Sequence, residues 1–190
     1  MKLNFRKIHR QIAPILFIPL FASALTGIAY RLGRSWFGIS NELADFLMVI
    51  HQGEYLGKPL VPLYVLLVGL GLLGMVITGL TMNGLFSENR PLPKSSKLVF
   101  RKVHRLIAPI TFLPLAVTAV TGIIFRLGTS WFGMPSEQAA IFLRIHQGTY
   151  LGAAIRPFYI LLVGLGLITM LVTGIKMTRI FRRNVKFSEN

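Results

Sequence analysis

The chain has 190 residues, of which 53% are hydrophobic and 14% are charged, and its mean hydropathy is +0.63. That composition is too apolar for an ordinary water-soluble domain. The net charge is +15, and the chain has no cysteine, which excludes disulfides, iron–sulfur clusters, thiol catalysis and c-type haem attachment.

The first predicted element is a membrane-spanning helix. The run Gln11–Tyr30 carries no charge, and about 20 apolar residues are enough to cross a bilayer core as a helix. The run does not alternate polar and apolar residues, as a strand of a membrane barrel would. It follows a basic decapeptide, FRKIHRQIAP, that begins at Phe5.

A loop with a short amphipathic helix comes next, in residues 31–58. Ser40 is a candidate N-cap, because a serine side chain can accept a hydrogen bond from the first turn. Apolar residues follow it at helical spacing, namely Leu43, Phe46, Leu47 and Ile50. We expect this helix to lie along the outer membrane surface.

A second membrane span follows in the uncharged run Pro59–Ser87. Pro59 and Pro62 mark its first turn, where a missing backbone N–H is tolerated. Residues 84–97 are then predicted to be a cytoplasmic linker.

The rest of the chain repeats this pattern at an offset of 95 residues. FRKVHRLIAP begins at Phe100, Leu106–Phe125 and Pro157–Ile175 are uncharged runs, and Ser136 is the second candidate N-cap. We therefore predict one repeat over residues 1–83, a second over 98–178 and a polar tail over 179–190.

The predicted fold is all-α, a bundle of four transmembrane helices built from two tandem repeats. Each repeat contains an even number of spans, so both copies share one orientation. They are then related by a pseudo-twofold axis along the membrane normal.

Basic residues are distributed unevenly along the chain. Segments 1–11, 84–105 and 176–190 hold 15 of the 21 lysines and arginines. This positive-inside pattern places both termini in the cytoplasm, and it explains the charge without nucleic-acid binding. We expect an integral, multi-pass protein in contact with lipid, in a bacterial inner membrane or a thylakoid membrane.

The four histidines fall into two layers. His9 and His104 are related by the repeat and begin the first spans on the inner side, whereas His51 and His146 precede the second spans on the outer side. A twofold axis along the normal preserves depth, so each layer offers two imidazoles that can bind a flat metal complex from both faces. Bis-histidine haem b, two per chain, fits this pattern.

Other interpretations of the histidines remain. Histidines near membrane interfaces often cap helices or reach toward water. A zinc site fits less well, because each layer supplies two histidines and no cysteine.

Threonine–glycine pairs are predicted to end the spans at the two histidine layers. Their glycines are Gly27 and Gly122 at the outer layer, and Gly79 and Gly174 at the inner layer. A glycine lets a porphyrin approach the backbone, although close helix packing explains the same residues.

Arg31 and Arg126 are the candidate partners of haem propionates, because they lie on the side that the positive-inside pattern leaves poor in charge. The run GLGLLG, at residues 69–74, matches a dinucleotide-binding pattern. It lies inside a membrane span with no preceding strand, so it carries no weight.

The motifs KIHRQIAP and KVHRLIAP, with IHQG before each second span, resemble those of the PepSY-associated transmembrane family in its short, cyanobacterial-type form. The resemblance covers nearly the whole chain. It implies a membrane electron-transfer or reductase role, with haem bound by His9, His51, His104 and His146. Larger relatives carry PepSY domains outside the membrane, and loops 31–58 and 126–156 are too short to hold one.

The sequence therefore favours a di-haem b-type membrane cytochrome that carries electrons across the bilayer. The donor would be a quinol or a reductase, and the acceptor ferric iron or a redox protein. The chain would act as an electron-transfer component or as a transmembrane reductase subunit. The alternative is a non-enzymatic membrane subunit or scaffold of a larger complex. A transporter is disfavoured, because the spans carry no acidic group at mid-membrane.

Overall fold

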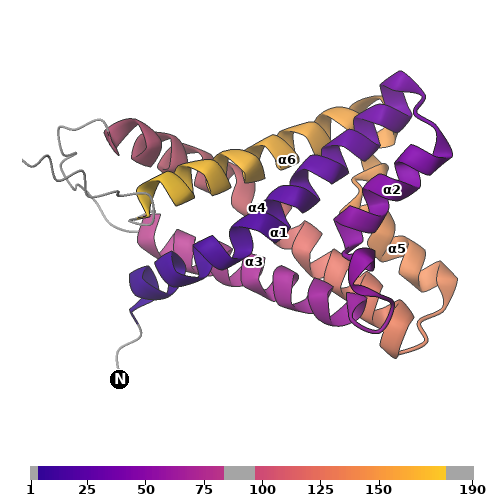
Figure 1. Ribbon diagram of the computed structural model, residues 1–190. Helices are drawn as coiled ribbons and strands as arrows, with labels where there is room; N and C mark the ends of the chain where they lie inside the picture. Colours follow the sequence, from indigo (N-terminus) through magenta and orange to yellow (C-terminus); the bar gives the residue numbers. More distant parts are fainter. Residues whose placement is uncertain (1–3, 84–96, 179–190) are drawn as a thin grey trace, which may run out of the picture.

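The computed structural model of the chain describes residues 4–83 and 97–178 (Figure 1). Within those residues the fold consists of four long helices, two short ones and connecting turns, with no strand. The helices are α1 (Phe5–Leu32), α2 (Asn41–Gln52), α3 (Val61–Asn83), α4 (Lys97–Trp131), α5 (Ser136–His146) and α6 (Gly152–Met177).

Four helical segments are long and apolar enough to cross a membrane, as the sequence predicts. They are Phe5–Phe37, Val61–Met82, Val99–Trp131 and Thr149–Met177. The first combines α1 with a π-helical turn, Gly33–Phe37, and the last combines a 3₁₀ turn with α6.

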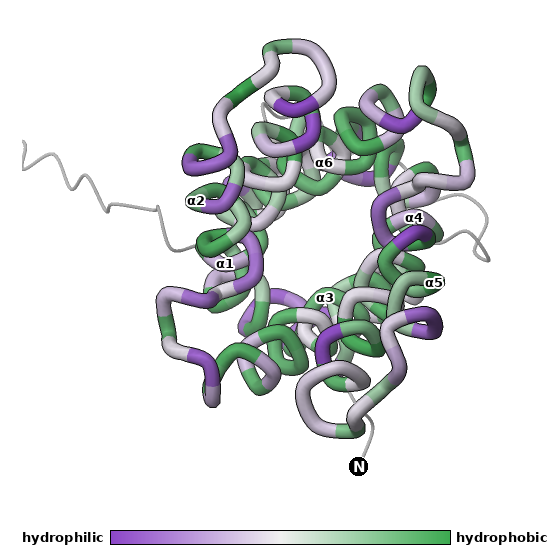
Figure 2. The backbone as a smooth tube through the Cα atoms, turned by 90° about the vertical axis from the view of Figure 1, so that its right-hand side faces the viewer, coloured by the Kyte–Doolittle hydropathy of each residue, from purple (hydrophilic) through white to green (hydrophobic). Residues whose placement is uncertain are grey.

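The four long helices form a ring in the order α1, α3, α4, α6, which Figure 2 shows along the bundle. Large apolar side chains point outward from the ring; Ile15 and Ile18 on α1 are 74% and 75% exposed, and Leu162 on α6 is 70% exposed. Because lipid tails solvate such side chains as well as a protein core does, an apolar exterior is consistent with an integral membrane protein.

The two short helices lie together at one end of the ring, on the right in Figure 1. Ser40 caps α2 as predicted, since its side chain accepts a hydrogen bond from the Leu43 N–H. The prediction for Ser136 is wrong. Pro135 occupies the capping position, with no side-chain hydrogen bond, and Ser136 is already the first helical residue.

The Thr–Gly pairs do not end the spans. Gly27 and Gly122 lie well inside α1 and α4, and Gly79 and Gly174 lie three or more residues before the ends of α3 and α6. Threonine and glycine stay helical here because packing against neighbouring helices overrides their weak helix propensity.

The predicted linker, residues 84–97, lies outside the described residues except for Lys97, where α4 begins, and so does the predicted tail, residues 179–190. Pro62 lies in the first turn of α3, as predicted, whereas Pro59 precedes that helix, which begins at Val61. Pro157 lies inside α6, because that helix begins earlier, at Gly152.

A leucine from each long helix closes the centre of the ring. Leu20 of α1, Leu72 of α3, Leu115 of α4 and Leu167 of α6 line both of the cavities described below. Three of them are less than 10% exposed. We call these four residues the leucine layer.

Candidate functional site

His51 reaches the interior of the ring from the last turn of α2. That helix ends at Gly53, whose φ of 74° is a left-handed conformation that suits glycine. The bare Cα of Gly53 packs against the ring of Tyr64 on α3. The glycine cap therefore turns the chain tightly from α2 toward α3, and His51 is held facing the bundle.

His146 is the last residue of α5 and is placed in a corresponding way. Gly148, two residues later, has a φ of 63° and packs against Tyr159 of α6. The motif IHQG thus has a local structural role, since its glycine lets the histidine-bearing helix dock on the next span.

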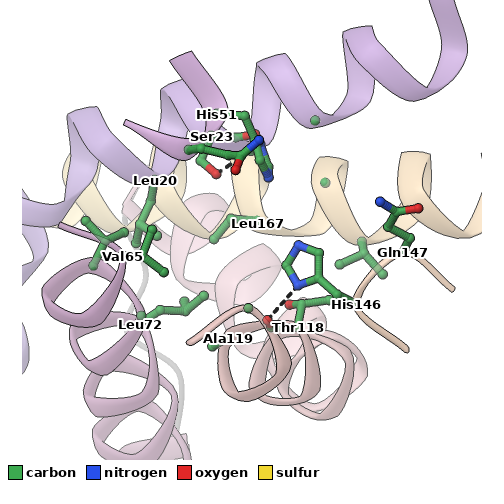
Figure 3. Close-up of a pocket in the computed structure, with 18 of the residues that line it drawn as sticks. Leu20, Ser23, His51, Val65, Leu72, Thr118, Ala119, His146, Gln147 and Leu167 are labelled. Atoms are coloured by element: carbon green, nitrogen blue, oxygen red, sulfur yellow. Dashed lines mark hydrogen bonds between the residues drawn. The ribbon is translucent and has the colours of Figure 1, made fainter. Parts of the chain in front are cut away.

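The rings of His51 and His146 lie near each other inside the bundle (Figure 3). Their centroids are 6.4 Å apart, and the ring planes are inclined by 69°. The sequence predicted that these two residues form one layer, and the structure brings them together.

Each of these imidazoles is fixed through its Nδ1 atom. His51 Nδ1 lies 2.9 Å from the carbonyl oxygen of Ser23, and His146 Nδ1 lies 2.8 Å from that of Thr118. A carbonyl oxygen only accepts hydrogen bonds, so Nδ1 carries the proton in both rings. Nε2 then keeps its lone pair, which is the atom that binds a metal.

Burial keeps both outer histidines neutral. It lowers the pKa of His51 to about 4, with a further contribution from His146, and it lowers the pKa of His146 as well. At neutral pH both residues are therefore in the uncharged form that metal coordination requires.

The two histidines line a cavity of about 370 Å³. All six helices contribute to it, and most of its wall is aliphatic. Its volume falls in the range of roughly 300–1,000 Å³ that is usual for small-molecule and cofactor sites. A cavity of this size, with two imidazoles and an apolar wall, suits a flat and largely apolar ligand.

Gly27 and Gly122 lie directly against these histidines. A Cβ atom on Gly27 would be 3.1 Å from His51 Cε1, and one on Gly122 would be 3.2 Å from His146 Cε1. We predicted that the glycines admit a porphyrin; the contacts present here show that each makes room for an imidazole.

Arginines surround this cavity, and both predicted ones, Arg31 and Arg126, line it. Arg31 donates a hydrogen bond to Gln147 Oε1 over 3.4 Å. Arg126 forms an ion pair with Glu54 over 3.5 Å. A further arginine, Arg156, donates to both the carbonyl oxygen and the side-chain oxygen of Gln147.

His9 and His104 line a second, smaller cavity, of about 70 Å³. His9 Nδ1 lies 2.8 Å from Thr78 Oγ1, and His104 Nδ1 lies 2.8 Å from Thr173 Oγ1. Both hydroxyls donate their proton to a helix carbonyl. They must therefore accept from Nδ1–H, which leaves Nε2 unprotonated in these histidines too.

Gly79 and Gly174 face the inner histidines less closely. A Cβ atom on either would be 3.6 Å from Cε1 of His9 or His104, which is an ordinary contact. The inner and outer histidines lie far apart. His9 and Ser23, the backbone partner of His51, are 14 residues apart on α1, or about 21 Å at 1.5 Å per residue.

No group of three or more His, Cys, Asp or Glu side chains that can hold a metal ion occurs in residues 4–83 and 97–178. A zinc ion needs three or four protein ligands, so a pair of imidazoles does not suffice. Two imidazoles do suffice for an iron whose other four ligands come from a porphyrin.

The separation of the outer rings tests this fit. An iron–imidazole bond of about 2 Å, with about 1.2 Å from the ring nitrogen to the ring centroid, places two axial imidazole centroids about 6.4 Å apart. The centroids of His51 and His146 are separated by 6.4 Å. The outer histidines therefore meet the distance condition for two imidazoles on one iron.

Comparisons with protein-family models, with curated proteins and with solved structures give no match to this chain. The resemblance to the PepSY-associated family therefore stays a prediction, and the assignment of the site depends on its geometry.

Sequence reasoning missed several residues that build the site. The carbonyls of Ser23 and Thr118 have no sequence signature, although the two positions are 95 residues apart. Thr78 and Thr173 were noticed only as neighbours of glycines, not as hydrogen-bond acceptors.

Three polar residues near the outer cavity were also missed, namely Glu54, Gln147 and Arg156. Glu54 and Gln147 contact arginines of distant segments, Arg126 and Arg31, whereas Arg156 contacts Gln147, nine residues earlier in the chain.

Proposed function

We propose that this protein is a di-haem b-type membrane cytochrome that carries electrons across the bilayer. One observation carries the proposal: the rings of His51 and His146, from different helices, have centroids 6.4 Å apart, which is compatible with two imidazoles on one iron, and Nδ1 of each is hydrogen-bonded so that Nε2 keeps its lone pair. Histidines that merely capped helices or reached toward water would have no reason to share this arrangement.

In the proposed outer centre, His51 and His146 would hold the haem iron. The Ser23 and Thr118 carbonyls hold the imidazole planes and fix the tautomer, as outer-shell partners of metal-bound histidines do. The mainly apolar wall and the leucine layer surround these imidazoles, which favours the neutral form of the ligands. Bound haem supplies reversible one-electron transfer, and the protein supplies ligation, position and electrostatics.

In the proposed inner centre, His9 and His104 are the ligands, and Thr78 and Thr173 orient them. The shared tautomer of all four histidines supports a second haem. The inner cavity of about 70 Å³ is below the usual size of a cofactor site, so lining side chains have to move when it fills. The lining includes Met75, whose flexible thioether side chain adapts readily.

Two centres about 21 Å apart along α1 would form a two-step path through the bundle. We further propose that residues 1–83 and 98–178 are tandem copies related by a twofold axis along the membrane normal. The 95-residue sequence offset and the paired hydrogen bonds of the histidines support this relation. The termini would lie in the cytoplasm, with a quinol or reductase as donor and ferric iron or a redox protein as acceptor.

The test is the visible spectrum of the protein purified after expression with adequate haem. A cytochrome shows a reduced-minus-oxidised difference in the Soret and α bands, and a pyridine haemochrome assay should give two haems per chain. One haem per chain would reduce the proposal to a single-centre cytochrome. A colourless protein would favour the alternative, a structural subunit of a larger membrane complex.

A further inference from the structure

The three arginines around the outer cavity differ in their partners. Arg31 and Arg126 occupy equivalent positions of the sequence repeat, yet Arg126 has a carboxylate partner, Glu54, at 3.5 Å, and Arg31 has a neutral amide. The residue 95 positions after Glu54 is Thr149, which has no charge, so the second half of the chain cannot provide Arg31 with the same pair. Charge is therefore balanced on one side of the cavity and unbalanced on the other.

Arg156 increases this imbalance. The position equivalent to Arg156 in the first half is Val61. Arg31 and Arg156 both donate to the side-chain oxygen of Gln147, a neutral group, and no ion pair of either arginine occurs within residues 4–83 and 97–178. Two guanidinium groups thus converge on one amide, with two positive charges and no negative one.

This corner presents hydrogen-bond donors to the cavity. Arg31 and Gln147 both line it, and Figure 3 shows Gln147 at the cavity edge beside His146. Because the Gln147 oxygen accepts from the arginines, its amide nitrogen is left to donate to a ligand. Charge-assisted donors in a half-buried corner are what a carboxylate ligand prefers.

We propose that haem binds in the outer cavity in one orientation, with its propionate carboxylates at the Arg31–Gln147 corner. Arg156 is a positioning residue that holds Gln147, and Arg126, neutralised by Glu54, is not a propionate partner. This inference depends on the proposed function, since it assumes haem between His51 and His146.

The experiment compares Arg31→Gln with Arg126→Gln, the matched change at the equivalent position of the repeat. Haem affinity is measured for haem b and for its dimethyl ester, in which the propionates carry no charge. Loss of a charge-assisted hydrogen bond should weaken haem b binding to Arg31→Gln by at least about tenfold. The affinity of Arg126→Gln for haem b should be within about threefold of that of the unaltered protein. The two variants should have equal affinities for the dimethyl ester.

Arg156→Val introduces the residue found at the equivalent position, and it tests the positioning role. It should weaken the binding of haem b less than Arg31→Gln does. The loss of affinity should again vanish when the dimethyl ester is used. Retained bis-histidine spectra and circular dichroism will show that each variant is folded and ligated.

A second measurement is the proton NMR spectrum of the ferric protein. Nuclear Overhauser contacts of the haem propionate methylenes report which corner they occupy, and one set of contacts, near Arg31, is expected for the outer centre. Glu54→Thr frees Arg126 and should add a second set of propionate contacts, because both sides of the cavity then carry an unbalanced arginine.

Equal effects of Arg31→Gln and Arg126→Gln, or a loss for Arg31→Gln that persists with the ester, would overturn the inference while leaving a bis-histidine cytochrome intact. Absence of a bis-histidine spectrum in the unaltered protein would instead refute the proposed function itself.

Discussion

Alanine substitutions at the four histidine-facing glycines should weaken haem binding at the outer histidine layer and leave the inner histidine layer unaffected. In Gly27→Ala the new Cβ would lie 3.1 Å from His51 Cε1 and 3.3 Å from its Nδ1. Carbon atoms prefer separations of about 3.5–4.0 Å, so the imidazole must move by at least about 0.4 Å. The alternative is that α1 and α2 separate.

That displacement is large for a metal ligand. Ligand distances in a well-formed metal site hold to within about 0.2 Å, and overpacking of this kind costs about 1–3 kcal/mol. We expect Gly27→Ala to weaken haem binding at the outer centre by about 5- to 150-fold, since 1.4 kcal/mol corresponds to a factor of ten. Gly122→Ala should act in the same way, because its Cβ would lie 3.2 Å from His146 Cε1.

The matched controls are Gly79→Ala and Gly174→Ala. Their Cβ atoms would make ordinary 3.6 Å contacts with His9 and His104. Alanine is favoured over glycine inside a helix by up to about 1 kcal/mol, so these variants should keep the inner centre and unfold at the same or a slightly higher temperature. The assays are redox titration for the haems and thermal unfolding in detergent. Equal haem loss in Gly27→Ala and Gly79→Ala would refute this reasoning.

Three further outcomes are expected. Thr78→Val removes the acceptor of the His9 Nδ1–H and should weaken haem binding at the inner centre about 10- to 100-fold. The control Thr81→Val, on the same helix, should leave that binding unchanged, and equal redox titrations of the two variants would count against the assigned tautomer. If His51 and His146 hold the haem with the 69° inclination of their ring planes, the ferric outer centre would give a strongly anisotropic low-spin EPR signal, and a rhombic signal would contradict that inclination. A tag after Asn190 should be accessible only from the cytoplasm, because 15 of 21 basic residues flank that side; labelling from outside would disprove the two-layer topology.

The sequence predicted the helical class well. Uncharged runs of about 20 residues are a strong signal, because a bilayer imposes one length on every span. The pairing of His51 with His146 also followed from the sequence, since the repeat places them at one depth. Analogy with the first copy failed at Ser136, because the position 95 residues after Ser40 is Pro135, and that proline occupies the capping position.

Contacts between distant segments were harder to predict. The Thr–Gly pairs were expected to end helices, but the helices continue through them, because packing against neighbouring helices overrides local propensity. Their glycines face imidazoles that come from other helices, such as His51 of α2 against Gly27 of α1. Nothing in the local sequence around Gly27 specifies that neighbour.

The asymmetry around the outer cavity departs furthest from a repeat-based prediction. Arg31 and Arg126 look equivalent in sequence, and they differ in structure because Glu54 and Arg156 each lack a charged counterpart 95 residues away. Positions at which two copies differ are therefore where a duplicated bundle acquires different properties on its two sides.

Haem content of histidine variants tests the central claim most directly. His51→Ala and His146→Ala should each remove one and the same haem, and the double variant should lose no more than either single one. His9→Ala and His104→Ala should each remove the other haem. Depletion of a single shared centre by His9→Ala and His51→Ala would contradict the account, because His9 lies near the start of α1 and His51 contacts Ser23, 14 residues further along that helix.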